Sequence, residues 1–233
     1  MIRAVALLTV VLTLLAGTEA SASWRATVDS LYAAAEREFA AGRYRPAAGL
    51  YARTADLVAA RDGTTDAYLA GMAARSVFLE ARSLERLERW DEAVESYLDA
   101  LEALPAVSDA VRVRLGRCYR KRGDFEAAVA VLREVIDDGA ATSFDIEALE
   151  ALGDAYREED DGRSALHWYE SMLAAASADE DVARAHYKIG LAHERRGDTD
   201  LALASFATVV NDHPRASASR DALRRGRASS RAF

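Results

Sequence analysis

The 233-residue sequence predicts an all-α protein, organised as a solenoid of about five helical hairpins that ends in a C-terminal capping helix. Proline occurs only three times, whereas Ala, Leu, Arg and Glu are frequent, and this composition favours helices. A second observation is a repeated corner, in which basic residues precede Gly-Asp and an Ala-rich apolar run. Two clear copies, at Gly123 and Gly197, are 74 residues apart, and weaker copies lie between and before them. Corners at this spacing indicate a repeat array.

The first 22 residues are predicted to be a secretory signal. Arg3 supplies a positive charge, an apolar run follows over residues 4–16, and small residues at 20–22 precede the expected cleavage site. The apolar run is shorter than the roughly 20 residues that a membrane-spanning helix needs. We therefore expect an exported mature chain, 23–233, without an integral membrane span, which is periplasmic if the host is a Gram-negative bacterium. The alternative is that the segment stays as an uncleaved anchor.

Charge and cysteine content narrow the class of protein further. The formal net charge of −8 disfavours a general nucleic-acid binder. Cys118 is the only cysteine, so no intramolecular disulfide can form, and a small buried thiol is expected. The fold of an exported chain without disulfides must be stabilised by packing alone.

Each corner predicts a helix, a tight turn and a second helix. Gly123 and Gly197 are expected to adopt the left-handed conformation that ends a helix. The basic residues before them suit the negative end of the helix dipole. Asp124 and Asp198 are expected to cap the next helix by accepting its free N–H groups. Further corners are predicted around Gly42, around Trp90, and at Asp160, where the glycine is displaced to Gly162.

Small and large side chains recur in phase with the corners. The pairs are Gly116 and Leu132, Gly153 and Tyr169, Gly190 and Phe206, with Ala81 and Tyr97, and Ala35 and Tyr51, before them. They resemble the eighth and twenty-fourth positions of the tetratricopeptide repeat, a helix-turn-helix unit of about 34 residues. The resemblance covers about residues 28–214, is weakest in the first unit, and implies a right-handed α-solenoid. A single irregular helical bundle is the alternative.

The predicted units follow from these positions. Residues 62–64 are interpreted as a break with a new N-cap, after which a long helix runs from about 65 to 86. A bulky side chain in place of Gly116 or Gly153 is expected to overpack the helix crossing. The units are expected at 28–61, 65–108, 109–145, 146–182 and 183–215, and the capping helix at about 216–225.

The sequence contains no phosphate-binding loop, nucleotide fingerprint or nucleophile elbow. His186 and His193 are seven residues apart, but both fall on packing positions of the repeat, so we interpret them as packing residues rather than metal ligands. The acidic run over 158–161 matches no calcium loop. We therefore expect no catalytic residue, metal or cofactor, and a protein that is not an enzyme.

In repeats of this kind the first helices line a concave groove that receives the partner. Several arginines on these helices predict a basic stretch, which favours an acidic or C-terminal-carboxylate peptide because Arg pairs bidentately with carboxylates. The alternative is that these arginines pair with Glu and Asp on neighbouring helices. The C-terminal arginines from 215 to 231 are interpreted as a solvated terminus or as a contact for anionic lipid or an acidic partner. The predicted groove residues are Tyr32, Phe78, Arg82, Arg86, Arg117, Arg120, Lys121 and Tyr187.

The expected function is a non-enzymatic scaffold or adaptor that binds a protein or peptide outside the cytoplasm. The stretch FATVVNDHPRASASRDAL resembles the last repeats of bacterial envelope proteins that work with the Tol–Pal system or outer-membrane assembly. The chain departs from that group because it lacks a lipidated cysteine and an N-terminal coiled coil. The alternatives are a structural component that stacks end to end and an accessory subunit of an envelope enzyme complex.

Overall fold

The computed structural model describes residues 23–61, 66–137 and 143–229, and every regular element in these ranges is helical. This confirms the all-α prediction. The predicted signal lies outside the described residues, as does the predicted break at 62–64. A helix over residues 23–40 comes first. It is followed by α2 (Tyr44–Ala59), α3 (Ala67–Arg86), α4 (Trp90–Ala103), the 3₁₀ turn η1 (Pro105–Val107), α5 (Ser108–Arg122), α6 (Phe125–Asp137), α7 (Ser143–Glu158), α8 (Gly162–Ala175), α9 (Asp179–Arg196), α10 (Thr199–Asp212) and α11 (Ala218–Ser229).

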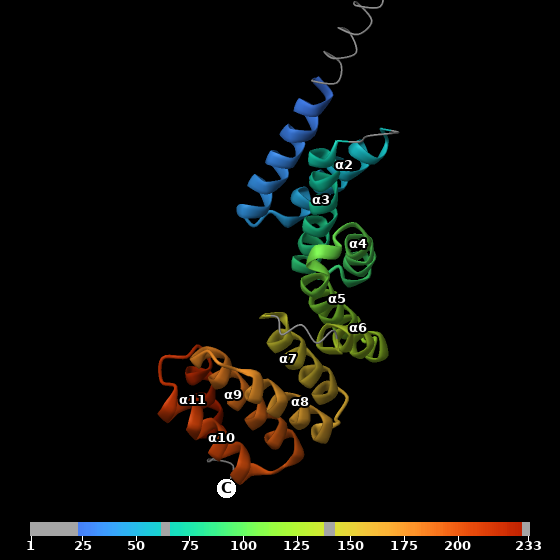
Figure 1. Cartoon of the computed structure of the whole chain (residues 1–233). Coiled ribbons are helices and arrows are strands. Elements are labelled where there is room, and N and C mark those ends of the chain that lie inside the picture. Colours follow the sequence, from blue (N-terminus) through green and yellow to red (C-terminus); the bar gives the residue numbers. More distant parts are fainter. Residues whose placement is uncertain (1–22, 62–65, 138–142, 230–233) are drawn as a thin grey trace, which may run out of the picture. The chain divides into compact units, whose positions relative to one another are not determined.

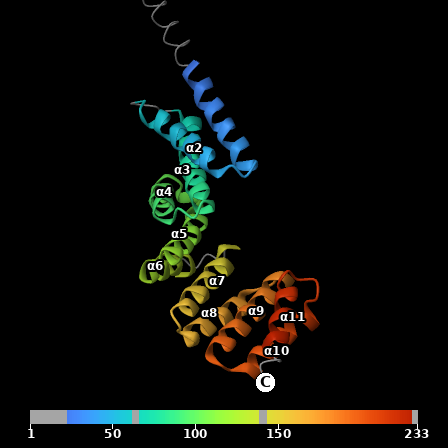
Figure 2. The same cartoon turned by 180° about the vertical axis from the view of Figure 1, so that it is seen from behind.

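The chain divides into two compact units, Met1–Ala106 and Val107–Phe233, here called unit 1 and unit 2. Unit 1 contains the helix over 23–40 and α2 to α4, and unit 2 contains α5 to α11 (Figure 1). Within each unit, consecutive helices pack as antiparallel hairpins, with α3 on α4, α5 on α6, α7 on α8 and α9 on α10. Figure 2 shows the row from α7 to α11 from behind, and α11 packs against both α10 and α9.

All five corners have the same backbone geometry. The left-handed residue is Gly42, Glu88, Gly123, Asp160 or Gly197. At each corner this residue and the next donate their N–H groups to carbonyls three and five residues back, for example Gly123 to Arg120 at 3.1 Å and Asp124 to Tyr119 at 2.9 Å. This pairing satisfies the free carbonyls at the helix end. The weaker copies around Trp90 and Asp160 therefore make the same turn without a glycine.

The expected cap at Asp198 is wrong. The carboxylate of Asp198 makes no capping hydrogen bond to α10, and it pairs instead with Arg196 at 3.1 Å. Asp124 likewise accepts a hydrogen bond from Arg122 Nε at 2.8 Å. The arginine near the end of the preceding helix thus competes with the N–H groups of the next helix for the aspartate carboxylate.

Side-chain caps occur at two other aspartates. Asp161 accepts from the Ser164 N–H at 3.0 Å and caps α8. Asp66 accepts from the Tyr68 N–H at 3.0 Å, so α3 begins at Ala67 rather than at residue 65, and it ends at residue 86.

At the other end of the chain, the capping helix α11 spans Ala218–Ser229, compared with the expected 216–225.

The small and large positions of the sequence meet inside the hairpins. A Cβ atom at Gly153 would lie 2.3 Å from the Tyr169 ring, and one at Gly190 would lie 2.5 Å from Phe206. The same substitution at Gly116 would bring a Cβ within 2.5 Å of Leu132. In unit 1, Ala35 lies with Tyr51 in one buried cluster, and Ala81 and Tyr97 are both fully buried. Cys118 is buried, as the sequence predicts.

Candidate partner-binding surfaces

The structure divides the predicted groove residues between the two units. Tyr32 lies on the helix over 23–40, and Phe78, Arg82 and Arg86 lie on α3 of unit 1. The remaining four belong to unit 2, where Arg117, Arg120 and Lys121 lie on α5 and Tyr187 lies on α9. The basic stretch that the sequence predicts therefore does not belong to a single compact unit. Its arginines on α3 and those on α5 contact different neighbouring side chains.

In unit 2 the arginines of α5 pair with the acidic helix that follows in the stack. Arg117 Nη2 lies 3.0 Å from Glu147 Oε2, and Arg120 donates to Glu158. These are the pairs with neighbouring helices that the sequence left open as the alternative. Lys121 is exposed at the end of α5. The positive charge of α5 is thus largely compensated within unit 2.

The same pairing continues along unit 2 between alternate helices. Arg184 Nε of α9 lies 2.9 Å from Glu150 of α7. Lys188 Nζ lies 3.0 Å from Glu150 and 2.8 Å from Asp154. Basic α5, acidic α7 and basic α9 thus form a ladder of ion pairs. Sequence reasoning missed Lys188, although Arg184 and Lys188 are four residues apart, as are Glu150 and Asp154, which is the spacing of one helix face.

Asp154 lies at the centre of this ladder and is largely buried. It accepts hydrogen bonds from Lys188 and, at 2.7 Å, from the Tyr169 O–H. Burial raises the pKa of Asp154, but the charge and hydrogen bond of Lys188 and the bond from Tyr169 outweigh it, so the pKa lies below its ordinary value. Burial, together with Asp154, raises the pKa of Tyr169. We conclude that these polar groups satisfy one another and hold α7, α8 and α9 together.

In unit 1 the guanidinium groups of Arg82 and Arg86, both on α3, lie on aromatic rings. Arg82 Cζ is 5.2 Å from the centre of the Phe39 ring and 5.9 Å from that of Phe78. Arg86 Cζ is 5.1 Å from the Tyr44 ring, and its Nη2 donates to Tyr44 Oη at 2.9 Å. Within the described part of the chain neither arginine forms an ion pair. Such stacking positions a guanidinium without neutralising its charge.

A cavity of about 460 Å³ lies between the helix over 23–40 and α3, and Arg75 of α3 is the arginine in its lining. The Tyr68 O–H donates to Asp29 Oδ1 at 3.1 Å across it. Burial and the nearby Glu36 raise the pKa of Tyr32. This cavity therefore combines aromatic, acidic and basic side chains on two first helices. Its walls are Asp29, Tyr32, Ala33, Glu36, Ala67, Tyr68, Gly71, Met72 and Arg75.

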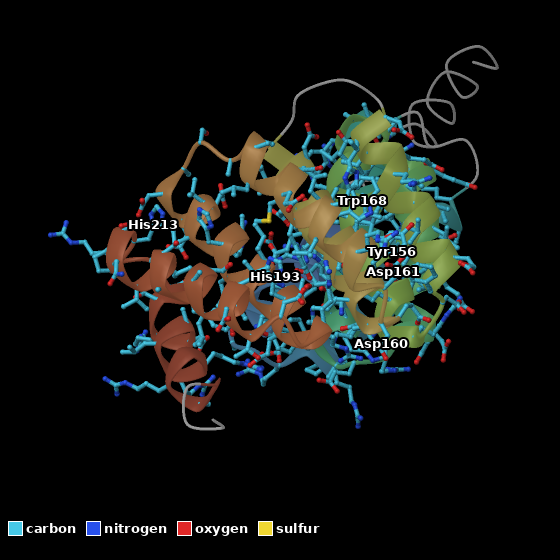
Figure 3. All side chains as sticks on the ribbon, turned by 90° about the horizontal axis from the view of Figure 1, so that it is seen from below. Tyr156, Asp160, Asp161, Trp168, His193 and His213 are labelled. Carbon is cyan, nitrogen blue, oxygen red and sulfur yellow. The ribbon has the colours of Figure 1, made fainter. Side chains whose placement is uncertain are left out.

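The histidines do not gather into a metal site. His213 Nδ1 lies 2.6 Å from Asp179 and its ring stacks on His186, whereas His193 lies 3.6 Å from Asp198. Figure 3 shows His193 and His213 well apart in unit 2. Burial and the neighbouring His213 lower the pKa of His186. Among the described residues, no group of three His, Cys, Asp or Glu side chains is placed to hold a metal ion.

Tyr156 and Trp168 lie on the other side of unit 2 from His213 (Figure 3). Their rings stack with centres 6.5 Å apart, and Phe125 packs edge-on against Tyr156 at 5.1 Å. These contacts join α6, α7 and α8, so this aromatic group acts in packing. None of the described helices is both long enough and apolar enough to span a membrane.

Comparison with known proteins agrees with this arrangement. Family models described as tetratricopeptide repeat match residues 78–146, 148–183 and 184–216. No curated protein matches the chain significantly by sequence.

Solved structures share the fold at low sequence identity. BtubC (BKLC) from P. vanneervenii is 18% identical, with a TM-score of 0.64, over 88% of this chain and 82% of its own. MamA from Desulfovibrio magneticus RS-1 is 17% identical, with a TM-score of 0.63, over 82% and 97%. A tetratricopeptide repeat protein from Parabacteroides merdae is 16% identical, with a TM-score of 0.62, over 81% and 67%. The chain therefore contains tetratricopeptide repeats, matched from residue 78 to residue 216, in consecutive helical hairpins that share the fold of these proteins.

Proposed function

We propose that the protein is a non-enzymatic scaffold that binds a segment of a partner protein in the groove of unit 1. The observation that carries this proposal is the difference between the two units. In unit 2, Arg117 and Arg120 already have carboxylate partners, whereas Arg82 and Arg86 of unit 1 lie on aromatic rings, and Arg75 on the same helix lines a cavity. A repeat array that buries its core by stacking offers such a groove as a rigid binding surface.

The chemistry of this groove favours an acidic segment. Arg75, Arg82 and Arg86 are spaced seven and four residues apart along α3, which places them on one helix face. Their guanidinium groups are suited to bidentate contacts with carboxylates. Tyr32 and Met72 provide apolar contact area in the cavity. Asp29 and Glu36 can accept hydrogen bonds from the N–H groups of an extended peptide.

A peptide selection tests this proposal. Extended 12-residue peptides are selected on the purified chain, and we expect acidic sequences to be enriched. Arg82→Glu/Arg86→Glu should lower the affinity of an enriched peptide at least about tenfold, because it turns attraction into repulsion. Arg45→Glu/Arg53→Glu, an equal charge change at exposed positions of α2, is the control and should keep the affinity. Enrichment without acidic residues, or an equal loss in both variants, would refute the acidic-segment proposal.

We also propose that the scaffold acts outside the cytoplasm, in the periplasm if the host is a Gram-negative bacterium. The charged, apolar and small segments of residues 1–22 support export, and the resemblance of residues 206–223 to envelope repeat proteins supports a role in the cell envelope. Fractionation of the host with N-terminal sequencing should find a chain that begins at Ser23 outside the inner membrane. A cytoplasmic chain that retains Met1 would contradict export.

A further inference from the structure

The C-terminal end of unit 2 carries an apolar groove between α10 and α11, with a volume of about 360 Å³. Its floor is formed by Leu203, Phe206 and Val210 of α10, and α11 contributes Ala222, Leu223 and Gly226. Asn211 and Arg227 lie at its edge, and none of the described residues that line it carries a carboxylate. A helix with an exposed apolar side chain has the shape that fills such a groove.

The groove is lined by α10 and α11, the last two of the described helices. α9 is covered by α8 on one side and by α10 on the other, whereas α11 contacts α10 and α9, and no later helix follows among the described residues. Figures 1 and 2 both show α11 at the outer edge of α9 and α10. Within the groove, 41% of Leu223 is exposed. An apolar groove with an exposed leucine is a natural surface for another helix.

The rim of this groove is basic. Arg220, Arg224 and Arg227 line a second depression that adjoins the groove through Leu223. The sequence of α11, ASRDALRRGRAS, holds four arginines and a single acidic residue, Asp221. Asp221 pairs with Arg224 at 2.9 Å, and Glu194 of α9 pairs with Arg225 at 2.7 Å, but four arginines still exceed these two carboxylates, so the net charge here is positive. The helix that fills this groove should therefore be acidic.

Helix α4 of unit 1 has the complementary character. Its sequence, WDEAVESYLDALEA, holds five acidic residues and no basic one. Its inner face, which includes Tyr97, is buried, while 43% of Leu98 is exposed on the outer face. Glu95, Asp99 and Glu102 surround Leu98 and are exposed as well. An exposed leucine among carboxylates matches an apolar groove among arginines in both shape and charge.

We infer that α4 of one copy docks into the α10–α11 groove of a second copy, with Leu98 on the apolar floor and the acidic residues of α4 facing Arg220, Arg224 and Arg227. A concave floor favours a helix over a membrane, because a flat lipid surface does not reach Leu203 and Phe206. The two surfaces are different, so the contact is heterologous, and each copy keeps one free end that can bind a further copy. This interface uses none of the unit 1 groove residues and is independent of the proposed function.

Variants that each disable one surface test the inference. Arg220→Glu/Arg224→Glu disables the groove, and Glu95→Arg/Glu102→Arg disables α4. In sedimentation equilibrium at low salt, the average mass of the unmodified protein should rise with concentration, and each variant alone should stay monomeric. An equimolar mixture should form a one-to-one dimer, because each variant retains the surface that the other lacks. The dimer should dissociate at about 0.5 M salt, where charges are screened within a few ångström.

Two controls separate this interface from a general charge effect. Glu126→Arg/Glu170→Arg places the same charge change on exposed positions of α6 and α8 and should leave self-association intact. A chain that carries both the groove and the α4 substitutions has exchanged its charges and should associate again. Circular dichroism verifies that each variant remains helical.

The inference is overturned by a monomeric mass of the unmodified protein at every concentration, or by a mixture of the two variants that stays monomeric. Flotation with vesicles of anionic lipid tests the competing occupant. If the protein binds these vesicles through Arg220 and Arg224 and does not self-associate, the groove serves a membrane instead, and the self-association model is wrong.

Discussion

At the scale of single residues, the pairing of a small and a large side chain determines how closely two helices of a hairpin approach. Tyr169 is fully buried over Gly153, and its O–H is fixed by Asp154 at 2.7 Å. The ring therefore has no free direction in which to move. A glycine is needed here because of the neighbouring ring rather than because of the backbone conformation, since Gly153 lies within α7.

Gly153→Ala tests this crossing. The added Cβ would lie 2.3 Å from the Tyr169 ring, so we expect the free energy of unfolding to fall by about 1–3 kcal/mol. Urea denaturation followed by circular dichroism measures the change. Gly49→Ala is the matched control, because no atom lies within 4 Å of its Cβ, and alanine in a helix should stabilise by about 0.5–1 kcal/mol. Equal effects of the two substitutions would contradict this account.

The left-handed residues at the corners are a second determinant at this scale. Glu88 has a φ of 58°, where a Cβ is strained, and its side chain is exposed. Glu88→Gly is therefore expected to raise the free energy of unfolding by about 1 kcal/mol. Thermal unfolding checks this, and Gly123→Ala, at a φ of 91°, should lower stability by a comparable amount. A loss of stability in Glu88→Gly would show that the strain at Glu88 is negligible.

At the scale of elements, the corners show what the sequence can and cannot reveal. Gly123 and Gly197 identify their own turns, because glycine is the residue that adopts a left-handed conformation most easily. The turns at Glu88 and Asp160 depend on periodicity for their prediction, since Glu gives no such signal and Asp gives a much weaker one than glycine. The expected cap at Asp198 failed because the sequence does not show that Arg196 reaches its carboxylate first.

The ion-pair ladder of unit 2 could be predicted only in part, for a similar reason. Each of Arg117, Glu150 and Lys188 lies on a first helix, and periodicity reveals that much. Which acid meets which base depends on the rotation of α5, α7 and α9 about their axes. Those rotations are set by packing at positions such as Gly153. The sequence therefore left the pairing of Arg117 and Arg120 as one of two alternatives.

The packing of α2, α3 and α4 brings acidic groups together around Glu80. Burial, and then the charges of Asp56, Asp99 and Glu92, raise the pKa of Glu80 to about 7 from 4.5. The folded state therefore keeps this proton up to about pH 7, while the unfolded chain releases it near pH 4.5. The contribution of Glu80 to the free energy of unfolding accordingly falls as the pH rises from 4.5 to 7. Above pH 7 Glu80 is ionised in both states, and its unfavourable charge destabilises the folded state in full.

Glu80→Gln removes this penalty. We expect the variant to exceed the unmodified protein in free energy of unfolding by about 1 kcal/mol at pH 8, after allowance for partial exposure to solvent. The difference should vanish at pH 4, where Glu80 is neutral in both states. Urea titrations across this range measure it, with Glu126→Gln on the exposed face of α6 as control. A difference that does not change with pH would show that Glu80 has no raised pKa.

At the scale of the whole molecule, the division into two compact units determines how far a local change spreads. In repeat proteins stability is approximately the sum of each repeat and its interfaces with the nearest neighbours. Unit 1 has its own buried clusters around Tyr51 and Leu69, and unit 2 has its own around Tyr169 and Phe206. Damage to one hairpin should therefore remain within its own unit.

Native-state hydrogen exchange of Gly153→Ala tests this locality. The substitution weakens the contact between α7 and α8, so amide protons in these helices and in α9, which packs on α8, should exchange faster than in the unmodified protein. Protons of α2 and α3 should exchange at unchanged rates, because their buried contacts lie within unit 1. Ala81→Leu, which enlarges a fully buried side chain of unit 1, should give the reverse pattern. If either substitution accelerates exchange equally in both units, the chain unfolds as one cooperative body, and the two compact units do not act as separate units of stability.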